Sequence, residues 1–318
     1  MVQTVTGPVR AEQLGRTLAH EHFFFGYPGF DAALSHPGCV RRERILEKGI
    51  RAAGTVLAQG FRTVLDATPN DCGRDPLLLR EIAMHTGLTI LCATGYYASG
   101  KSAPGYWDFR IKHGDAVREY AELLEQELTA GIRNTGICAG FIKCATGYGP
   151  MTAMESHLLR GAALAQQRTG AVIYTHTENG ILAEEQAGLL LKAGADPSRC
   201  VIGHLCGERD LSKLLRILQK GFFIGFDRLG SIDEKRPAVA ETMEMISRLA
   251  DLGYEDRIVL SQDTVCCFLG APFEPDWENH YFGYLADSYL PLLTAEQGVS
   301  ENAIGDMLAG NIRRLFAD

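Results

Sequence analysis

The chain has 318 residues, of which 46% are hydrophobic and 22% are charged, and its formal net charge is −8 at pH 7. These proportions are typical of a globular protein that can bury a large core. The acidic balance argues against a nucleic-acid partner, because proteins of that class present a basic face to the phosphates.

The compartment is predicted from features that the sequence lacks. No apolar run approaches the length of about 18 residues that a membrane span needs. The first ten residues, MVQTVTGPVR, do not have the basic and then apolar pattern of a signal peptide. The nine cysteines are scattered and do not indicate a disulfide framework. We therefore expect a cytoplasmic protein with no membrane partner.

Eight short, nearly continuous apolar runs predict strands that are buried on both faces. In chain order they span residues 16–22, 63–68, 89–94, 140–145, 171–176, 201–205, 221–227 and 258–263. Segments with helical periodicity lie between them, the clearest at residues 44–59, 116–130, 153–168, 182–192, 211–219 and 238–252. This alternation predicts an α/β fold, a single (β/α)8 TIM barrel that forms one domain over residues 1–318. An open, doubly wound parallel sheet is the alternative.

Two predicted connections are longer than the others, at residues 95–115 and 264–283. In a barrel both would lie at the C-terminal ends of the strands, where active sites are built. They are rich in aromatic residues, proline and glycine, which suits the rim of a substrate site. The alternative is that they are ordinary covering loops.

Polar side chains recur at the C-terminal ends of the predicted strands. They are His20 and His22 on the first strand, Lys143 on the fourth, His176 on the fifth, His204 on the sixth and Asp263 on the eighth. The first two are two residues apart, so on a strand they point to the same face. One buried histidine is usually a hydrogen-bonded core residue. Several ligand-type residues at one end of a barrel instead indicate a site for Zn or a neighbouring divalent metal.

Lys143 differs from the others, because it lies within the apolar run AGFIKCA. An ammonium group buried there would carry a large desolvation cost, which favours the free amine. A free amine can react with CO2 to form a carbamate, an anion that can bridge two metals. The alternative is a lysine whose amine reaches the rim of the barrel.

Six motifs together resemble the phosphotriesterase family, a branch of the amidohydrolase superfamily that includes the phosphotriesterase-like lactonases. They are HEH, AGFIKCA, YTHTE, IGHL, GFDRLG and SQDTVCC, on the first and the fourth to eighth predicted strands. The resemblance runs from GPV at Gly7 to GNIRRLF near the C-terminus. The motifs are specific when they are taken jointly, whereas each alone is weak.

The resemblance implies a hydrolase with a binuclear metal centre. The more buried metal would be held by His20, His22 and Asp263, and the more exposed one by His176 and His204. Carboxylated Lys143 and a hydroxide would bridge the two metals, which would lie ~3.5–4 Å apart. The hydroxide would be the nucleophile, and Asp263 would accept its proton. We expect Zn, although this ligand set also accepts Co, Mn or Fe.

Two residues favour the lactonase branch over the true phosphotriesterases. Tyr97, in ATGYY, matches a tyrosine that those lactonases keep near the more exposed metal, where it orients a lactone. Arg228, in GFDRLG, matches their arginine after the seventh strand. The alternatives are that Tyr97 packs the third connection and that Arg228 pairs with Asp227 or another carboxylate of the rim.

The sequence departs from the family's pattern at positions that leave the substrate open. Gln262 stands where the lactonases often have histidine, Thr264 where an aromatic is common, and Ile312 where many relatives have proline. The third connection does not resemble the apolar loop of lactonases that act on long acyl-homoserine lactones.

The two long connections point to different substrates. The eighth favours a neutral ester, lactone or amide through its apolar residues Phe268, Leu269, Phe273, Trp277, Tyr281 and Phe282. The third carries Lys101, Arg110 and Lys112, which would either meet an anionic substituent or form a solvated face.

We therefore expect a metal-dependent hydrolase of a small molecule, a lactonase or carboxylic esterase with phosphotriester (aryldialkylphosphatase) cleavage as a side activity. Hydrolysis of an N-acyl amide or of a phosphorylated sugar lactone at the same centre is the alternative within this class. A barrel that binds metals without catalysis is the alternative of another class, although all six ligand positions hold competent residues. Because relatives in this family commonly form dimers, we expect a homodimer.

Overall fold

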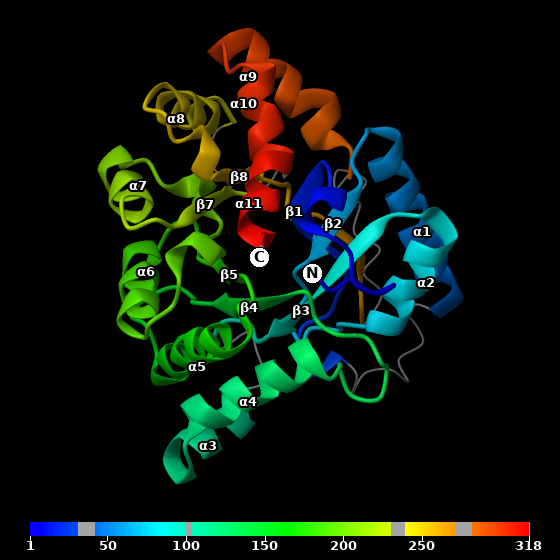
Figure 1. The fold of residues 1–318 in the computed structure, drawn as a ribbon, viewed down its shortest axis with the longest axis vertical. Coiled ribbons are helices and arrows are strands. Elements are labelled where there is room, and N and C mark those ends of the chain that lie inside the picture. The colour runs from blue at the N-terminus through cyan, green and yellow to red at the C-terminus, as the bar shows by residue number, and fades with distance from the viewer. Residues whose placement is uncertain (31–41, 100–103, 230–238, 271–281, 318) are drawn as a thin grey trace.

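The structure is a computed structural model that describes residues 1–30, 42–99, 104–229, 239–270 and 282–317. Its strands form one curled parallel sheet (Figure 1). They are β1 (Thr17–Phe25), β2 (Thr63–Asp66), β3 (Thr89–Gly95), β4 (Phe141–Ala145), β5 (Ile173–His176), β6 (Cys200–Ile202), β7 (Phe223–Phe226), β8 (Ile258–Leu260) and β9 (Val265–Phe268). The eight predicted strands are confirmed to within a few residues. Strand β9 was not predicted, because its residues were assigned to the connection after the eighth strand.

The order of the strands across the sheet is β8-β7-β6-β5-β4-β3-β2-β1-β9. Strands β1 to β8 are thus neighbours in chain order, whereas a doubly wound sheet reverses its order at a switch point. The doubly wound alternative is therefore not supported. Strand β9 pairs with the second half of β1, where His22 lies opposite Val265. The segment between β8 and β9 also bonds to β1, since the amide of Asp263 donates to the His20 carbonyl oxygen at 3.1 Å.

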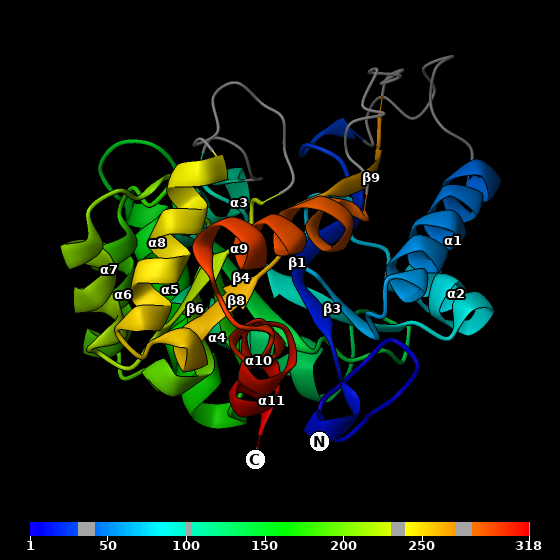
Figure 2. The same cartoon turned by 90° about the horizontal axis from the view of Figure 1, so that it is seen from above.

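Helices surround the sheet, and the two chain termini lie together at the end opposite β9 (Figures 1 and 2). The helices are α1 (Arg42–Ala58), α2 (Pro76–Thr86), α3 (Pro104–His113), α4 (Ala116–Thr129), α5 (Ala153–Thr169), α6 (Ala183–Lys192), α7 (Leu211–Leu218), α8 (Val239–Asp251), α9 (Leu290–Gln297), α10 (Glu301–Gly305) and α11 (Asn311–Phe316). The six predicted helices are confirmed. Among the helices within the described ranges, none combines the length and the apolar character that crossing a membrane requires.

Helices α2, α3, α9, α10 and α11 were not predicted. Helix α2 has clear signals at both ends, since the Asp75 side chain accepts from the amide of Leu78 and Gly87 follows in a left-handed conformation. Helix α3 lies within residues 95–115, which the prediction treated as an irregular loop. It is anchored by Trp107, whose buried ring packs at 5.3 Å between centroids against Tyr120 of α4.

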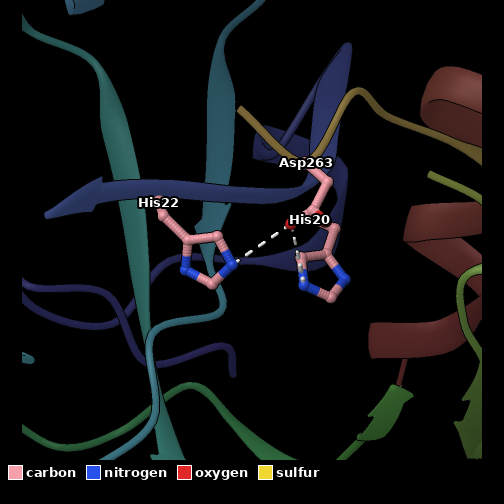
Figure 3. A group of neighbouring side chains, drawn as sticks. All are labelled: His20, His22 and Asp263. Carbon is pink, nitrogen blue, oxygen red and sulfur yellow. Dashed lines mark ion pairs between the residues drawn. The ribbon is translucent and has the colours of Figure 1, made fainter. Parts of the chain in front are cut away.

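Strand β1 changes its register against β2 between Leu18 and Glu21. Such an irregularity re-aims side chains. Adjacent residues of a regular strand point to opposite sides, but here Ala19 and His20 both point into the space that the curled sheet encloses. His22 points to the same side as His20 (Figure 3). The prediction that the two histidines share a face is correct, and the strand is less regular than that prediction assumed.

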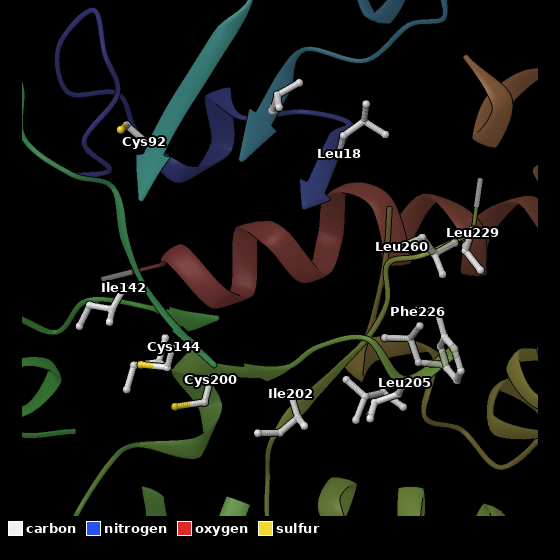
Figure 4. Packing of buried hydrophobic residues seen from close by; sticks show 14 of the residues in the cluster. Leu18, Cys92, Ile142, Cys144, Cys200, Ile202, Leu205, Phe226, Leu229 and Leu260 are labelled. Atoms are coloured by element: carbon white, nitrogen blue, oxygen red, sulfur yellow. The ribbon is translucent and has the colours of Figure 1, made fainter. Parts of the chain in front are cut away.

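The sheet is apolar on both sides because it separates two clusters of buried residues. The outer cluster lies between the strands and the helices (Figure 4), and the inner one fills the space that the curled sheet encloses. Adjacent residues alternate between the clusters, as in Leu18 and Ala19, Val64 and Leu65, Ile90 and Leu91, and Ile258 and Val259. Ile312, in α11, is fully buried in the inner cluster. The inner side is thus filled near the chain termini, which leaves the opposite end for a site.

Candidate metal centre

Four of the predicted ligand residues converge, with His20 and His22 in the middle of β1, Lys143 in the middle of β4 and Asp263 three residues after β8. Lys143 Nζ lies 2.7 Å from His20 Nε2. Asp263 Oδ1 lies 3.8 Å from His20 Nε2 and 3.3 Å from His22 Nε2 (Figure 3). Asp263 has a φ of 54°, a left-handed conformation that is uncommon for residues other than glycine. The residue follows a buried strand, and this turn directs its carboxylate toward the two histidines.

The other two predicted ligands, His176 and His204, stand beside this group at the ends of β5 and β6. Their rings are 4.4 Å apart between centroids. His204 Nε2 lies 3.7 Å from Asp263 Oδ2. His204 also has a left-handed backbone, with a φ of 59°. The structure thus brings all six predicted residues together, and two of them adopt backbone conformations of the kind that cluster at functional sites.

His22 and His204 are oriented as metal ligands usually are, through a hydrogen bond to the second ring nitrogen, whereas His20 Nδ1 faces a carboxylate without hydrogen-bond geometry. His22 Nδ1 lies 2.9 Å from Thr68 Oγ1. Asp227 lies 3.3 Å from His20 Nδ1 and 2.7 Å from His204 Nδ1. These contacts leave the Nε2 atoms of the three rings to face Asp263.

The protonation states also suit a divalent metal. Burial lowers the pKa of His20 to about 4 and that of His176 to about 3, so both rings are neutral at pH 7. Burial would raise the pKa of Asp263, but the charge of Arg228 and a hydrogen bond from His22 help to hold that pKa well below its usual value. Neutral imidazoles beside an ionised carboxylate are ligands that Zn and its neighbours bind. The residues present therefore fit a metal.

Lys143 is 1% exposed, and it does not reach the rim. Burial lowers the pKa of its amine to about 8, although the charges of Asp263 and Asp227 oppose that change. Its backbone position depends on Gly95 at the end of β3, which has a φ of 132°. A Cβ atom on that glycine would lie 1.9 Å from the Lys143 carbonyl oxygen, so the two strands approach this closely only with glycine there.

Asp227 is a functional residue whose role the sequence did not reveal. Its Oδ1 accepts from the His204 amide at 2.8 Å and its Oδ2 accepts from the Tyr174 hydroxyl at 2.7 Å, in addition to the two imidazole contacts. The sequence suggested Asp227 only as an ion-pair partner of Arg228. The available signal was its position, a carboxylate directly after a buried strand and in line with the ligands.

Glu21, between the two histidines of β1, was also overlooked. Its Oε1 accepts from Ser261 Oγ at 2.6 Å and from the Gln262 amide at 3.0 Å, and its Oε2 accepts from the Thr264 amide at 2.7 Å. Burial raises the pKa of this carboxyl to about 8, although these hydrogen bonds oppose the change. Glu21 thus holds the turn that presents Asp263.

A cavity of ≈ 160 Å³ opens onto the converging residues. Its polar wall consists of the candidate ligands His22, Lys143, His176, His204 and Asp263, with Tyr97 and Arg228. Its apolar wall consists of Phe25, Tyr27, Pro69, Val265 and Phe268. A small, partly apolar cavity beside a group of metal-binding side chains suits a compact organic substrate.

The whole-chain sequence agrees with this geometry. The model of the phosphotriesterase family matches residues 1–316. The chain belongs to the phosphotriesterase family.

Several members of the phosphotriesterase family are similar to the chain over its full length. It is 31% identical to the phosphotriesterase homology protein of Mycobacterium tuberculosis, over 99% of this chain and 97% of the relative. It is 27% identical to the aryldialkylphosphatase of Saccharolobus solfataricus, over 97% of both chains. The crystal structure of a variant of a PTE-like lactonase from Deinococcus radiodurans superposes with a TM-score of 0.95, at 41% identity and 100% coverage of both chains.

The two residues that pointed to the lactonase branch of the phosphotriesterase family both reach the cavity. The Tyr97 hydroxyl lies 3.5 Å from His176 Nε2. Arg228 Nε donates to Asp263 Oδ2 at 2.8 Å, so Arg228 pairs with a carboxylate of the site and not with Asp227. Their catalytic roles stay predictions.

The predicted substrate loops are only partly described. Phe268 lines the cavity, and Phe282 is buried against Phe23, with ring centroids 5.7 Å apart. Arg110 lies on α3 and donates to Glu119 at 2.6 Å, away from the cavity wall. Leu269 and Lys112 are not among the residues that line the cavity. The remaining predicted loop residues, Lys101, Phe273, Trp277 and Tyr281, lie outside the described ranges.

Proposed function

We propose that this phosphotriesterase-family protein is a binuclear-metal-dependent hydrolase of lactones or other carboxylic esters, with phosphotriester cleavage as a side activity. The observation that carries the proposal is the convergence of six donor side chains, five of which line one small cavity with an apolar wall. Structures similar at 40 to 41% identity are described as a PTE-like lactonase and as a weak promiscuous lactonase used as a template for organophosphate hydrolysis, which supports lactone hydrolysis with phosphotriester cleavage as a side activity.

Each of two divalent cations has candidate ligands in the site. One would be held by His20, His22 and Asp263 and the other by His176 and His204, with carboxylated Lys143 between them. Zn is the metal we propose, and Co, Mn and Fe suit the same donors. When bound, such a pair of cations acts as a Lewis acid toward a carbonyl and lowers the pKa of water at the site.

The chain's own residues supply the remaining chemistry. The Asp263 carboxylate is ionised at pH 7, so it can take the proton that the attacking water loses. Arg228 donates to Oδ2 of that carboxylate and fixes its orientation. Tyr97, which lies beside His176 on the cavity wall, would orient the substrate. Phe25 and Phe268 limit the access of bulk water to the reacting ester.

We further propose that the sheet closes as a (β/α)8 barrel and that residues 1–318 form one domain, which acts as a homodimer. The hydrogen bonds of Ser261 and Asp263 to the backbone of His20, at 3.0 and 3.1 Å, support the closure. The eight described cysteines are free, which supports a reducing compartment such as the cytoplasm.

Turnover of a substrate panel tests the proposed function. Protein loaded with Zn in the presence of bicarbonate is expected to hydrolyse γ- and δ-lactones with a kcat/KM about 100-fold or more above that for an aryl phosphotriester, because the two reactions need differently shaped transition states. Turnover of N-acyl amides alone would leave the metal centre in place and overturn the lactone assignment. Two bound metals without turnover of lactones, esters, amides or phosphotriesters would favour the non-catalytic alternative.

The depressed pKa of Lys143 predicts how carboxylation depends on pH. The amine is cationic below its pKa of about 8, and only the neutral amine reacts with CO2. Between pH 7 and pH 9 the neutral fraction rises from about one tenth to about nine tenths. At a fixed concentration of dissolved CO2, the rate of reactivation of metal-free protein by Co²⁺ is therefore expected to rise about tenfold and then level off. A rate that continues to rise about tenfold per pH unit beyond pH 9 would indicate an ordinary lysine.

A further inference from the structure

Arg228 places a permanent positive charge in the cavity wall. Its side chain is 13% exposed, and its guanidinium is bonded to Asp263 on one side. Among the described residues that line the cavity, Lys143 and Arg228 are the lysine and the arginine, and we propose that Lys143 is carboxylated. An accessible guanidinium of this kind binds carboxylates and phosphates through paired hydrogen bonds. Taken alone, Arg228 would favour an anionic substrate.

A second carboxylate lies on the other side of this guanidinium. Glu178 Oε2 is 3.9 Å from Arg228 Nη1, and its side chain is 4% exposed. Glu178 stands two residues after His176, and its Oε1 lies 3.4 Å from His176 Nε2. It is not among the residues that line the cavity, so it faces the arginine from behind the wall. No role in the proposed hydrolysis uses this buried carboxylate.

The charges explain why a carboxylate is useful there. A guanidinium that is largely removed from water needs a compensating charge. The Asp263 carboxylate supplies a compensating charge, but in the proposed function this carboxylate also binds a cation, which takes up part of its negative charge. Glu178 is then the carboxylate that balances Arg228. At this distance in a poorly hydrated site, a negative charge also repels an anionic group that approaches the same guanidinium.

We propose that Glu178 is a specificity-determining residue, which neutralises Arg228 and thereby restricts the cavity to uncharged substrates. This inference rests on the proposed function and narrows it to neutral lactones and esters, as opposed to lactones that carry a carboxylate or a phosphate. It has a second consequence, because hydrolysis of a lactone leaves a carboxylate beside Arg228. Glu178 weakens the hold of Arg228 on that product.

The test compares two lactones of equal size that differ in charge, 5-oxotetrahydrofuran-3-carboxylate and its carboxamide. The readout is the ratio of kcat/KM for the anionic lactone to that for the neutral one. In Glu178→Gln the ratio is expected to rise about tenfold or more, chiefly through a lower KM for the anionic lactone. Glu178→Asp retains the charge and is expected to keep the ratio near that of the wild type.

Three outcomes would overturn the inference. The first is a ratio that stays within about twofold in a folded, metal-loaded Glu178→Gln protein. The second is an equal rise in the aspartate variant, which would show that shape and not charge is responsible. The third is an equal loss on both lactones together with loss of metal, which would make Glu178 a support for His176 only.

The inference can be tested even if the proposed function fails. If the wild type hydrolyses neither lactone, calorimetric binding of 4-hydroxybutyrate, the carboxylate that opening of γ-butyrolactone yields, replaces turnover as the readout. Binding about tenfold tighter to Glu178→Gln than to the wild type and to Glu178→Asp would support the charge-balancing role. Equal affinity of all three proteins would overturn it.

Discussion

The Lys143→Ala variant is expected to lose both metals and to retain less than about 1% of the wild-type kcat/KM toward lactones, while it remains folded. Alanine cannot carry the carbamate that we place between the cations, and the loss of one ligand from such a centre removes the chemistry that the cations supply. The fold should tolerate the change, because burial already disfavours the charged amine, as its depressed pKa shows.

Metal per chain, circular dichroism and kcat/KM measured on the same preparation check this prediction. Lys112→Ala is the matched control, since that lysine is exposed on α3, away from the cavity. His22→Ala is expected to behave as Lys143→Ala does, because the His22 ring faces Asp263 at 3.3 Å. Full metal content with normal turnover in either variant would exclude the binuclear centre.

The Asp227→Asn variant is expected to bind metal about 10- to 100-fold more weakly and to lose at least as much in kcat/KM, although it changes no proposed ligand. The carboxylate accepts from the His204 amide, the His204 ring and the Tyr174 hydroxyl, and it also faces the His20 ring. An amide has one accepting oxygen, so its NH2 group would face donors that need an acceptor. The His20 and His204 rings would then lose their fixed orientation.

Competition with a chelator of known affinity measures this effect. Tyr174→Phe is the matched control, because it removes one donor to Asp227 and leaves the carboxylate and both imidazole contacts in place. A smaller loss of metal affinity is expected there. Equal losses in the two variants, or metal affinity within about twofold of the wild type in Asp227→Asn, would contradict the orienting role.

The sequence predicted the candidate metal ligands, but it did not predict the residues that orient them, Asp227 and Glu21. The reason is physical. Lys143 and His176 can be recognised as candidate ligands from the sequence, because a charged or titratable side chain in or at the end of an apolar run has few structural explanations. Asp227 and Glu21 are also charged residues in or directly after apolar runs, but each is adjacent to a residue that drew the prediction instead, Arg228 in one case and the two histidines of β1 in the other. Their partners, such as Ser261 and His204, are distant in the chain and come together only when the sheet has formed.

The fold shows a similar division. Residue periodicity predicted β1 to β8 and six of the helices, since burial on one or two faces leaves a clear pattern. It missed β9, which is four residues long and starts two residues after Asp263, within a segment that was treated as a loop. It also missed the irregularity in β1, because backbone register depends on neighbouring strands and not on the local sequence.

The contacts of Glu21 have a consequence for how the protein matures. The three groups that Glu21 binds lie 240 to 243 residues further along the chain. When the ribosome has synthesised the segment with His20 and His22, the nascent chain still lacks both Asp263 and the turn that positions its carboxylate. Contacts between such distant segments form late, since the long intervening loop must first be ordered. The site is accordingly completed only after nearly the whole chain has been synthesised, and stable uptake of the proposed cations would report that folding is finished.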